Sequence, residues 1–291
     1  MGQPCEKSWS HGCLFGEAGS VIWICATCGV ETADRAAPPG TCAICEDERQ
    51  WVPAEGQQWT TLSALRSKGT RIVVTEVEPQ LWGLTAAPEV GIGQQTMLVR
   101  TPQGSLLFDC VGFVDDASVE FVLGLGPVLA VAASHPHMYG VQTEWAKALG
   151  APVILADRDR EWVRRPELVE FYDEAREVAP GLTLHRVGGH FAGQTVVEWA
   201  AGNAGRGVLL AGDAIFPNPD GRTVSFMRSY PNRMPLSGNV VQRIAAQVSQ
   251  LHFDRLYNNF GAVVPRGAKA VIRHSADRHT AWVRGDFDHL T

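Results

Sequence analysis

Val128-Leu-Ala-Val-Ala-Ala-Ser-His135-Pro136-His137 is the stretch that decides the fold, because an apolar run ends abruptly in two histidines separated by one residue. Side chains alternate along a strand, so the two imidazoles of a His-x-His at its end point to the same side. We therefore expect a buried strand that delivers both rings to one edge of a sheet.

Two other apolar runs end in the same way. Residues 183–187 lead through two glycines to His190, and residues 207–212 lead to Asp213. A single histidine after a strand is more often a satisfied core or loop residue than a ligand. Three strand ends with compatible chemistry in one chain favour a shared cation instead. The nitrogen and oxygen set suits zinc or ferrous iron, with the ligands His135, His137, His190 and Asp213.

The composition bounds the class of protein and its partners. The 291 residues are enough for one large domain beside a small module, and 45% hydrophobic with 19% charged residues is an ordinary globular balance. The formal net charge is -6 and no run is rich in Lys or Arg, which argues against nucleic-acid and membrane partners. We expect a small-molecule substrate and leave a homo-oligomer open.

A cytoplasmic location is expected from the same sequence. The longest uncharged apolar run, residues 122–133, is too short to span a bilayer and is interrupted by glycine and proline. The N-terminus lacks the basic-then-apolar pattern of a signal peptide. In that compartment the seven cysteines are expected to be metal ligands and reduced thiols, not disulfides.

Two C-x-x-C pairs predict a separate, structural metal site. Cys25 and Cys28 form the first pair and Cys42 and Cys45 the second, with thirteen residues between the pairs. Two such turns facing each other close a tetrahedral sulfur site, and the bound ion then stabilises the small segment around it. We place this zinc module at residues 1–55 and the main domain at residues 56–291. Three cysteines are taken as ordinary thiols: Cys5, Cys13 and Cys110.

The module resembles a zinc ribbon or a rubredoxin. The first knuckle, Cys28-Gly29, fits both families, but no proline follows Cys42 and Glu46 stands where rubredoxins have glycine. Zinc is therefore preferred to an electron-transferring iron.

In the main domain, strand patterns come first in hairpins and then alternate with helix patterns, which predicts a mixed-sheet α/β domain with helices outside. Strands are expected at residues 71–77, 97–100, 105–109, 152–156, 196–199 and 207–211, and helices at 141–149, 158–176 (with a break at Pro166), 238–251 and 268–283. The glycines of residues 91–96 are taken as a loop, not a dinucleotide fingerprint. No G-x-S-x-G motif occurs, which disfavours a serine hydrolase.

The order Asp109, His135-x-His137, Gly-Gly-His190 and Gly-Asp213 resembles the metallo-β-lactamase superfamily across roughly residues 60 to 291. The resemblance implies an αββα sandwich with its metal site at one edge. It also implies that the three histidines hold the first metal and that Asp213 is the bridging carboxylate. Asp109 matches a buried aspartate that orients the histidine loop in that family.

The ligands of that family's second metal are missing. The residues after His137 are Met138, Tyr139 and Gly140, so Tyr139 takes the place of an aspartate and Gly140 that of a histidine. After the strand expected near residues 253–257 the chain continues with two asparagines, Asn258 and Asn259, where the family has its last histidine. A single-metal site follows.

Catalytic and substrate-binding roles are expected for a few further side chains. The missing aspartate is the usual group that orients and deprotonates water, so another base is needed. Tyr139 is either a donor to a developing oxyanion or a packed aromatic. The loop of residues 225–233 is either a substrate wall or a surface loop with incidental aromatics. As a wall it would contribute Met227, Arg228 and Tyr230, together with Phe191 and Trp82.

The leading interpretation is a mononuclear zinc hydrolase of a small ester, thioester or lactone. The first alternative is a mononuclear iron oxygenase, because persulfide dioxygenases of the same superfamily resemble a site with His135, His190 and Asp213 on one face. The second is a pseudoenzyme or interaction module in which the broken motif marks lost chemistry.

Overall fold

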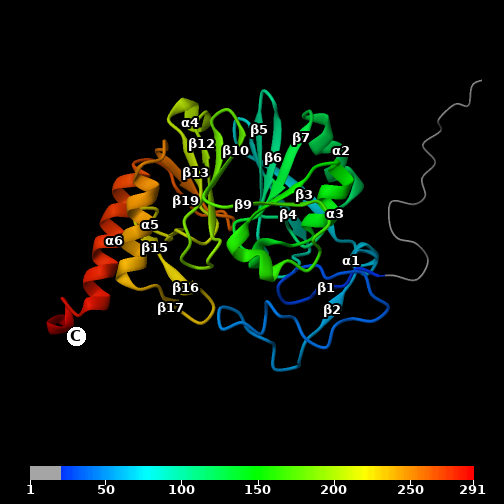
Figure 1. Cartoon of the computed structure of the whole chain (residues 1–291), viewed down its shortest axis with the longest axis horizontal. Helices are drawn as coiled ribbons and strands as arrows, with labels where there is room; N and C mark the ends of the chain where they lie inside the picture. The colour runs from blue at the N-terminus through cyan, green and yellow to red at the C-terminus, as the bar shows by residue number, and fades with distance from the viewer. Residues whose placement is uncertain (1–20) are drawn as a thin grey trace, which may run out of the picture.

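The computed structural model describes residues 21–291. Two β-sheets face each other, and helices cover the outer face of each sheet (Figure 1). This is the mixed-sheet α/β domain that the sequence patterns predicted, arranged as the αββα sandwich that the family resemblance implied. None of the helices in this part of the chain is long and apolar enough to cross a bilayer. The expectations for Cys5, Cys13 and the N-terminal residues fall outside the described residues.

The first sheet changes from antiparallel to parallel pairing along its width. Its strands lie in sequence order, with antiparallel pairs from β3 to β6 and parallel pairs from β6 to β9. They are β3 (Arg71–Glu78), β4 (Leu81–Ala87), β5 (Thr96–Thr101), β6 (Gly104–Phe108), β7 (Val128–Ala132), β8 (Val153–Ala156) and β9 (Val169–Tyr172).

The second sheet has the order β10-β11-β12-β13-β18-β19, and only β13 and β18 pair in parallel among these strands. The strands are β10 (Ala175–Ala179), β11 (Leu182–Arg186), β12 (Thr195–Trp199), β13 (Val208–Leu210), β18 (Arg255–Tyr257) and β19 (Val263–Val264). Shorter pairs lie outside both sheets: β1 (Ile24–Cys25) with β2 (Trp59–Thr60), β14 (Phe216–Pro217) with β15 (Val224–Ser225), and β16 (Met227–Ser229) with β17 (Met234–Pro235).

Helices cover the two outer faces. Near the first sheet lie α1 (Leu62–Ser67), α2 (Asp116–Gly124) and α3 (Gln142–Leu149), and beside the second lie α5 (Gly238–Ser249) and α6 (Ala268–Arg284). The short α4 (Gly202–Gly205) precedes β13, and 3-10 turns occupy Pro136–Met138, Asp157–Trp162 and Asp288–Leu290.

Alternation along the strands divides the core into layers. In β6, Leu106 and Phe108 face the second sheet, whereas Leu107 belongs to the outer core under the first set of helices. In β13, Leu210 lies between the sheets and Leu209 packs toward α5 and α6. Strands that are buried on both faces have continuous runs of apolar residues, so these strands could be recognised in the sequence.

The prediction of a helix over residues 158–176 is wrong. The chain forms only the 3-10 turn Asp157–Trp162, and then strands β9 and β10. Val169 pairs with Val153 of β8, while Arg176 pairs with Leu184 of β11 in the other sheet. The chain passes from the first sheet to the second between β9 and β10. Pairing of these strands with distant strands outweighs their local helix propensity.

The cysteine module, which includes β1, packs along the lower edge of the sandwich in Figure 1. All four cysteines of its two knuckles belong to the same buried cluster as the outer core of the first sheet. Its chain also approaches the main domain closely, since Gly29 lies against Gly91 and leaves no space for a Cβ at Gly91. The module is therefore attached to the edge at which the histidines emerge.

Candidate metal centre

The loop after β7 is oriented by a buried aspartate. Asp109 Oδ1 accepts a hydrogen bond from the Ser134 backbone N–H at 2.6 Å, and Ser134 Oγ lies 2.8 Å from His135 Nδ1. Burial raises the pKa of Asp109 to about 8. The position expected for Asp109, behind the histidine loop and not at the cation, is the position that it takes.

The three imidazoles converge. The turn after His135 brings the His137 ring to a centroid distance of 5.0 Å, and the His190 ring lies 4.8 Å from that of His135. His190 Nδ1 lies 3.1 Å from the Met227 carbonyl oxygen, which can only accept, so the proton of the neutral ring is on Nδ1. His190 Nε2 therefore carries a lone pair, and it lies 3.2 Å from His137 Nδ1.

Asp213 completes the group. Its Oδ2 lies 3.6 Å from His135 Nε2 and 4.0 Å from His190 Nε2. One ligand atom from each of the four residues lies within 4.8 Å of the others, and all four side chains are buried. The preceding Gly212 has a φ of +52°, and a Cβ there would meet the Ser134 side chain, so the approach of these two loops requires glycine.

The electrostatics of the group fit a divalent cation. Burial lowers the pKa of all three histidines, that of His190 to about 4, and raises the pKa of Asp213 to about 7. Neutral imidazoles offer lone pairs, and both His135 Nε2 and His137 Nε2 are buried without a hydrogen-bond partner. Buried polar atoms are normally paired, so a bound ion accounts for these unpartnered atoms.

The positions of a second metal are closed by packing. A Cβ at Gly140 would lie 2.1 Å from the Cys110 carbonyl oxygen, so no histidine fits there without moving backbone. Tyr139 is fully buried in the outer core, and its hydroxyl is directed at the Asp159 carbonyl oxygen. Of the two roles considered for Tyr139, this placement fits the packed aromatic and not the oxyanion donor. The Asn259 amide contacts the Met138 sulfur instead of the site.

A cavity of about 250 Å³ opens onto the group. It is lined by His137, His190 and Asp213 at its base and by mostly apolar side chains elsewhere: Gln50, Trp51, Ile92, Phe216, Tyr230, Pro231 and Phe260. Of the expected substrate wall, only Tyr230 lines this cavity, and its hydroxyl donates to the Asp213 carbonyl oxygen at 3.1 Å.

The other members of the expected wall lie elsewhere. Phe191 is buried behind the imidazoles, with its ring 4.8 Å from His137 and 5.4 Å from His135. Arg228 is paired with Glu48 at 2.7 Å, and Met227 contributes its carbonyl group to His190. Trp82 packs against Phe121 of α2 on the outer face of the first sheet, so its assignment to the wall is wrong.

Sequence reasoning missed the segment that follows the second knuckle. Arg49 donates to the His190 carbonyl oxygen at 3.2 Å, and its guanidinium lies over the Phe191 ring. Gln50 and Trp51 line the cavity. No local motif marks these residues, because each contact joins positions more than a hundred residues apart. The only signal was their place directly after a metal knuckle.

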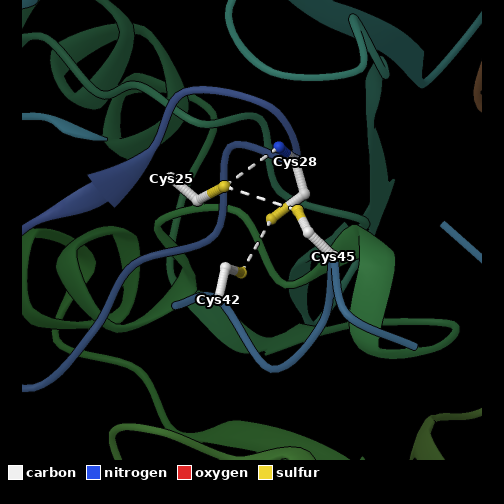
Figure 2. Close-up of side chains that lie close together, drawn as sticks. All are labelled: Cys25, Cys28, Cys42 and Cys45. Carbon is white, nitrogen blue, oxygen red and sulfur yellow. Dashed lines mark hydrogen bonds between the residues drawn. The ribbon is translucent and has the colours of Figure 1, made fainter. Parts of the chain in front are cut away.

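The cysteine cluster has the geometry of a closed sulfur site. The four sulfur atoms point toward one another (Figure 2), with Cys25 Sγ 3.5 Å from Cys45 Sγ and Cys28 Sγ 3.8 Å from Cys42 Sγ. All four lie within 4.8 Å of one another and are buried. Gln57 Nε2 also donates to Cys25 Sγ at 3.1 Å, as expected for a thiolate. These residues fit the structural zinc site that the spacing predicted.

Comparisons with known proteins agree with this fold. The sequence model of the metallo-beta-lactamase superfamily matches residues 91–257. The uncharacterized protein YmaE of Bacillus subtilis (strain 168) is 42% identical over 270 residues, which cover 92% of this chain and 98% of YmaE. Similar solved structures include the metallo-beta-lactamase DIM-1 (13% identity, TM-score 0.53, 71% of this chain and 95% of that one) and the mono-zinc form of FIM-1 from Pseudomonas aeruginosa (16% identity, TM-score 0.51, 72% and 96%).

Proposed function

The chain belongs to the metallo-beta-lactamase superfamily, and on that premise we propose that it is a mononuclear zinc hydrolase of a small ester, thioester or lactone. The observation that carries the proposal is the convergence of four buried ligand side chains, with unpartnered lone pairs on His135 Nε2 and His137 Nε2, beneath a cavity open to a small molecule. The ligands we assign are His135, His137, His190 and Asp213.

One ion, not two, is supported by the packing around the site. The histidine position of a second ion is held by Gly140, whose backbone is pressed against the carbonyl groups of Cys110 and Val111. The solved structure of the metallo-beta-lactamase FIM-1 is a mono-zinc form, so a site of this fold can hold a single zinc ion. A bound zinc ion would supply Lewis acidity and lower the pKa of a water molecule to about 7.

The residues of the chain have separable tasks. Arg49 and Phe191 fix the rear of the imidazole group, so the lone pairs stay directed at one point. Asp213 is the only carboxylate among the residues that line the cavity, and its Oδ1 has no hydrogen-bond partner. With Oδ2 turned toward His135 and His190, we assign Oδ1 as the acceptor of the proton that an attacking water loses.

Elemental analysis of purified protein tests the proposal. We expect two zinc ions per chain, of which His135→Ala removes one and Cys42→Ala the other. His185→Ala serves as the matched control, because His185 pairs with Glu198 on β12 and should leave both ions in place. Unchanged metal content in His135→Ala would refute the site, and the loaded protein should hydrolyse at least one member of a panel of generic esters, thioesters and lactones.

The alternatives give different outcomes in the same preparation. Anaerobic purification that yields iron at the histidine site, with oxygen uptake in the presence of a thiol substrate, would favour the oxygenase. A histidine site that takes up no metal at saturating zinc would favour the interaction module, since the fold would then be retained without its chemistry.

A further inference from the structure

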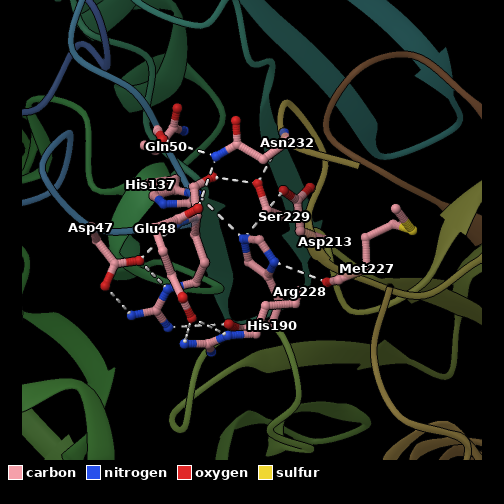
Figure 3. A network of polar contacts seen from close by, with 11 residues as sticks. Asp47, Glu48, Gln50, His137, His190, Asp213, Met227, Arg228, Ser229 and Asn232 are labelled. Atoms are coloured by element: carbon pink, nitrogen blue, oxygen red, sulfur yellow. Dashed lines mark hydrogen bonds and ion pairs between the residues drawn. The ribbon is translucent and has the colours of Figure 1, made fainter. Parts of the chain in front are cut away.

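The wall of the cavity is held in place by bonds between two segments that are far apart in the sequence. Segment 47–51 follows the knuckle of Cys42 and Cys45, and it lies against the loop of residues 227–233 (Figure 3). Ser229 Oγ donates to the Arg49 carbonyl oxygen at 3.0 Å. Asn232 Nδ2 donates to the carbonyl oxygens of Glu48 at 2.8 Å and Gln50 at 3.1 Å. Three consecutive carbonyl groups are thus fixed, which orders the chain that carries Trp51.

The positive charges near the cavity are already paired. Arg49 forms a two-pronged contact with the Asp47 carboxylate, and Arg228 donates twice to Glu48 Oε1, at 2.9 and 2.7 Å. No lysine or arginine is among the residues that line the cavity. A negatively charged group that entered would give up its hydration without gaining a cationic side chain as partner.

Aromatic rings line much of the cavity. The Phe216 ring lies 4.8 Å from that of Tyr230 and 5.9 Å from that of Phe260. Trp51 and Phe260 are 44% and 38% exposed, although both are large apolar side chains. Exposed aromatic rings gathered around one opening are typical of a site that binds an apolar group.

We propose that the cysteine module is the specificity element of this site, and that its Trp51 wall selects a substrate with an uncharged aromatic or compact apolar group beside the scissile bond. The inference rests on the proposed function, which it deepens by naming the substrate class. A cavity of about 150 Å³ is enough for benzene. The 250 Å³ present here therefore takes one ring and the carbonyl group attached to it.

Binding of benzamide and benzoate tests the proposal without requiring hydrolysis. Both compounds carry the same ring, and only benzoate is charged. Ligand-observed NMR is performed on the zinc-loaded protein and again after the histidine site alone has been emptied, because a carboxylate can bind zinc directly. In the emptied protein we expect benzamide to bind at least about tenfold more tightly than benzoate. Equal or tighter binding of benzoate would overturn the charge selection.

Two variants connect the wall to the module. Trp51→Ala is expected to weaken benzamide binding about tenfold, whereas Trp282→Ala, at a comparably exposed tryptophan of α6, should leave it unchanged. Cys42→Ala should weaken benzamide binding like Trp51→Ala while zinc at the histidine site is retained. Unchanged benzamide binding in Trp51→Ala, or in a folded Cys42→Ala protein, contradicts the role of the module.

The two proposals can fail separately. Benzamide binding that depends on Trp51, in a protein that hydrolyses no ester or thioester, would retain the apolar site and refute the hydrolase. Hydrolysis of phenyl acetate with an unchanged KM in Trp51→Ala would retain the hydrolase and refute the wall.

Discussion

The guanidinium carbon of Arg49 lies 3.6 Å from the centroid of the Phe191 ring. Phe191 in turn packs against all three imidazoles, so the cysteine module reaches the rear of the metal site through one buried cation and one buried ring. Arg49 also donates to the His190 carbonyl oxygen. This contact makes Arg49 a positioning residue that belongs to neither metal site.

Arg49→Ala should weaken zinc binding at the histidine site by about tenfold or more, the usual effect of removing a group that orients a ligand. It should also lower the free energy of unfolding by about 2 kcal/mol, since a cation–π contact and a charged hydrogen bond are lost together. Chelator competition and chemical denaturation measure the two effects. Arg176→Ala is the control, because that exposed side chain pairs only with Glu170. Equal zinc affinity in Arg49→Ala and the native protein would contradict the positioning role.

A second prediction concerns the closed position of the second metal. Gly140 has a φ of +50° and no space for a Cβ, so Gly140→Ala combines backbone strain with a clash. We expect it to cost about 3 kcal/mol of stability, measured by thermal or chemical denaturation. At Gly124 in α2 a Cβ would meet nothing, and Gly124→Ala should be neutral or stabilising by up to about 1 kcal/mol. Similar stability of the two variants would show that Gly140 is not constrained by packing.

Three of the metal ligands, His135, His137 and Asp213, could be predicted from the sequence because they follow the mostly buried apolar strands β7 and β13, which have a strong local signal. His190 follows β11, which is buried on one face only. The alternation of strand side chains predicted His135 and His137 on one side, but β7 ends at Ala132 and it is the 3-10 turn Pro136–Met138 that brings the two rings together. The glycines before His190 and Asp213 marked the turns at which loops approach closely. Helices α3, α5 and α6 were predicted from their apolar periodicity for the same local reason.

The remaining parts depend on contacts that no local pattern encodes. Strand β9 lies inside the helix that the sequence predicted over residues 158–176, and it forms because it pairs with the distant strand β8. Phe191 and Tyr230 are both aromatic residues near the site, yet one supports the imidazoles and the other lines the cavity. Arg49 has its place because the cysteine module packs on the main domain. Composition and spacing do not report such packing.

A third prediction compares two substitutions of Asp109 that are expected to change zinc affinity by different amounts. Its pKa of about 8 means that the side chain is mostly uncharged at neutral pH. Asparagine keeps an oxygen for the Ser134 N–H, so Asp109→Asn should change zinc affinity less than about threefold. Asp109→Ala leaves that buried N–H without a partner and should weaken zinc binding by about 10–100-fold. Metal competition assays on both variants measure this difference, and equal losses would indicate that the charge of Asp109, not its hydrogen bond, supports the site.

The pH dependence of metal binding provides the last prediction. Burial raises the pKa of Asp213 to about 7 and lowers that of His190 to about 4, so the group that must lose a proton when a cation binds is the carboxyl, not an imidazole. As the pH rises toward 7, zinc affinity at this site should rise about tenfold per pH unit, because the Asp213 carboxyl must lose its proton. Above pH 7 the contribution of the carboxyl levels off, and a further rise comes from ionisation of the water that zinc would bind.

Calorimetry in two buffers of different ionisation enthalpy, on protein whose cysteine site keeps its ion, measures the protons released. At pH 6 we expect about one proton, from the Asp213 carboxyl. At pH 8 the carboxyl releases close to none, and a proton released there comes from the water that zinc would bind. The same titration in Asp109→Asn should give the same values, because Asp109 does not contact the cation. Close to no proton release at pH 6, with release found only below pH 5, would assign the titration to the histidines alone. The burial of Asp213 would then not control metal uptake.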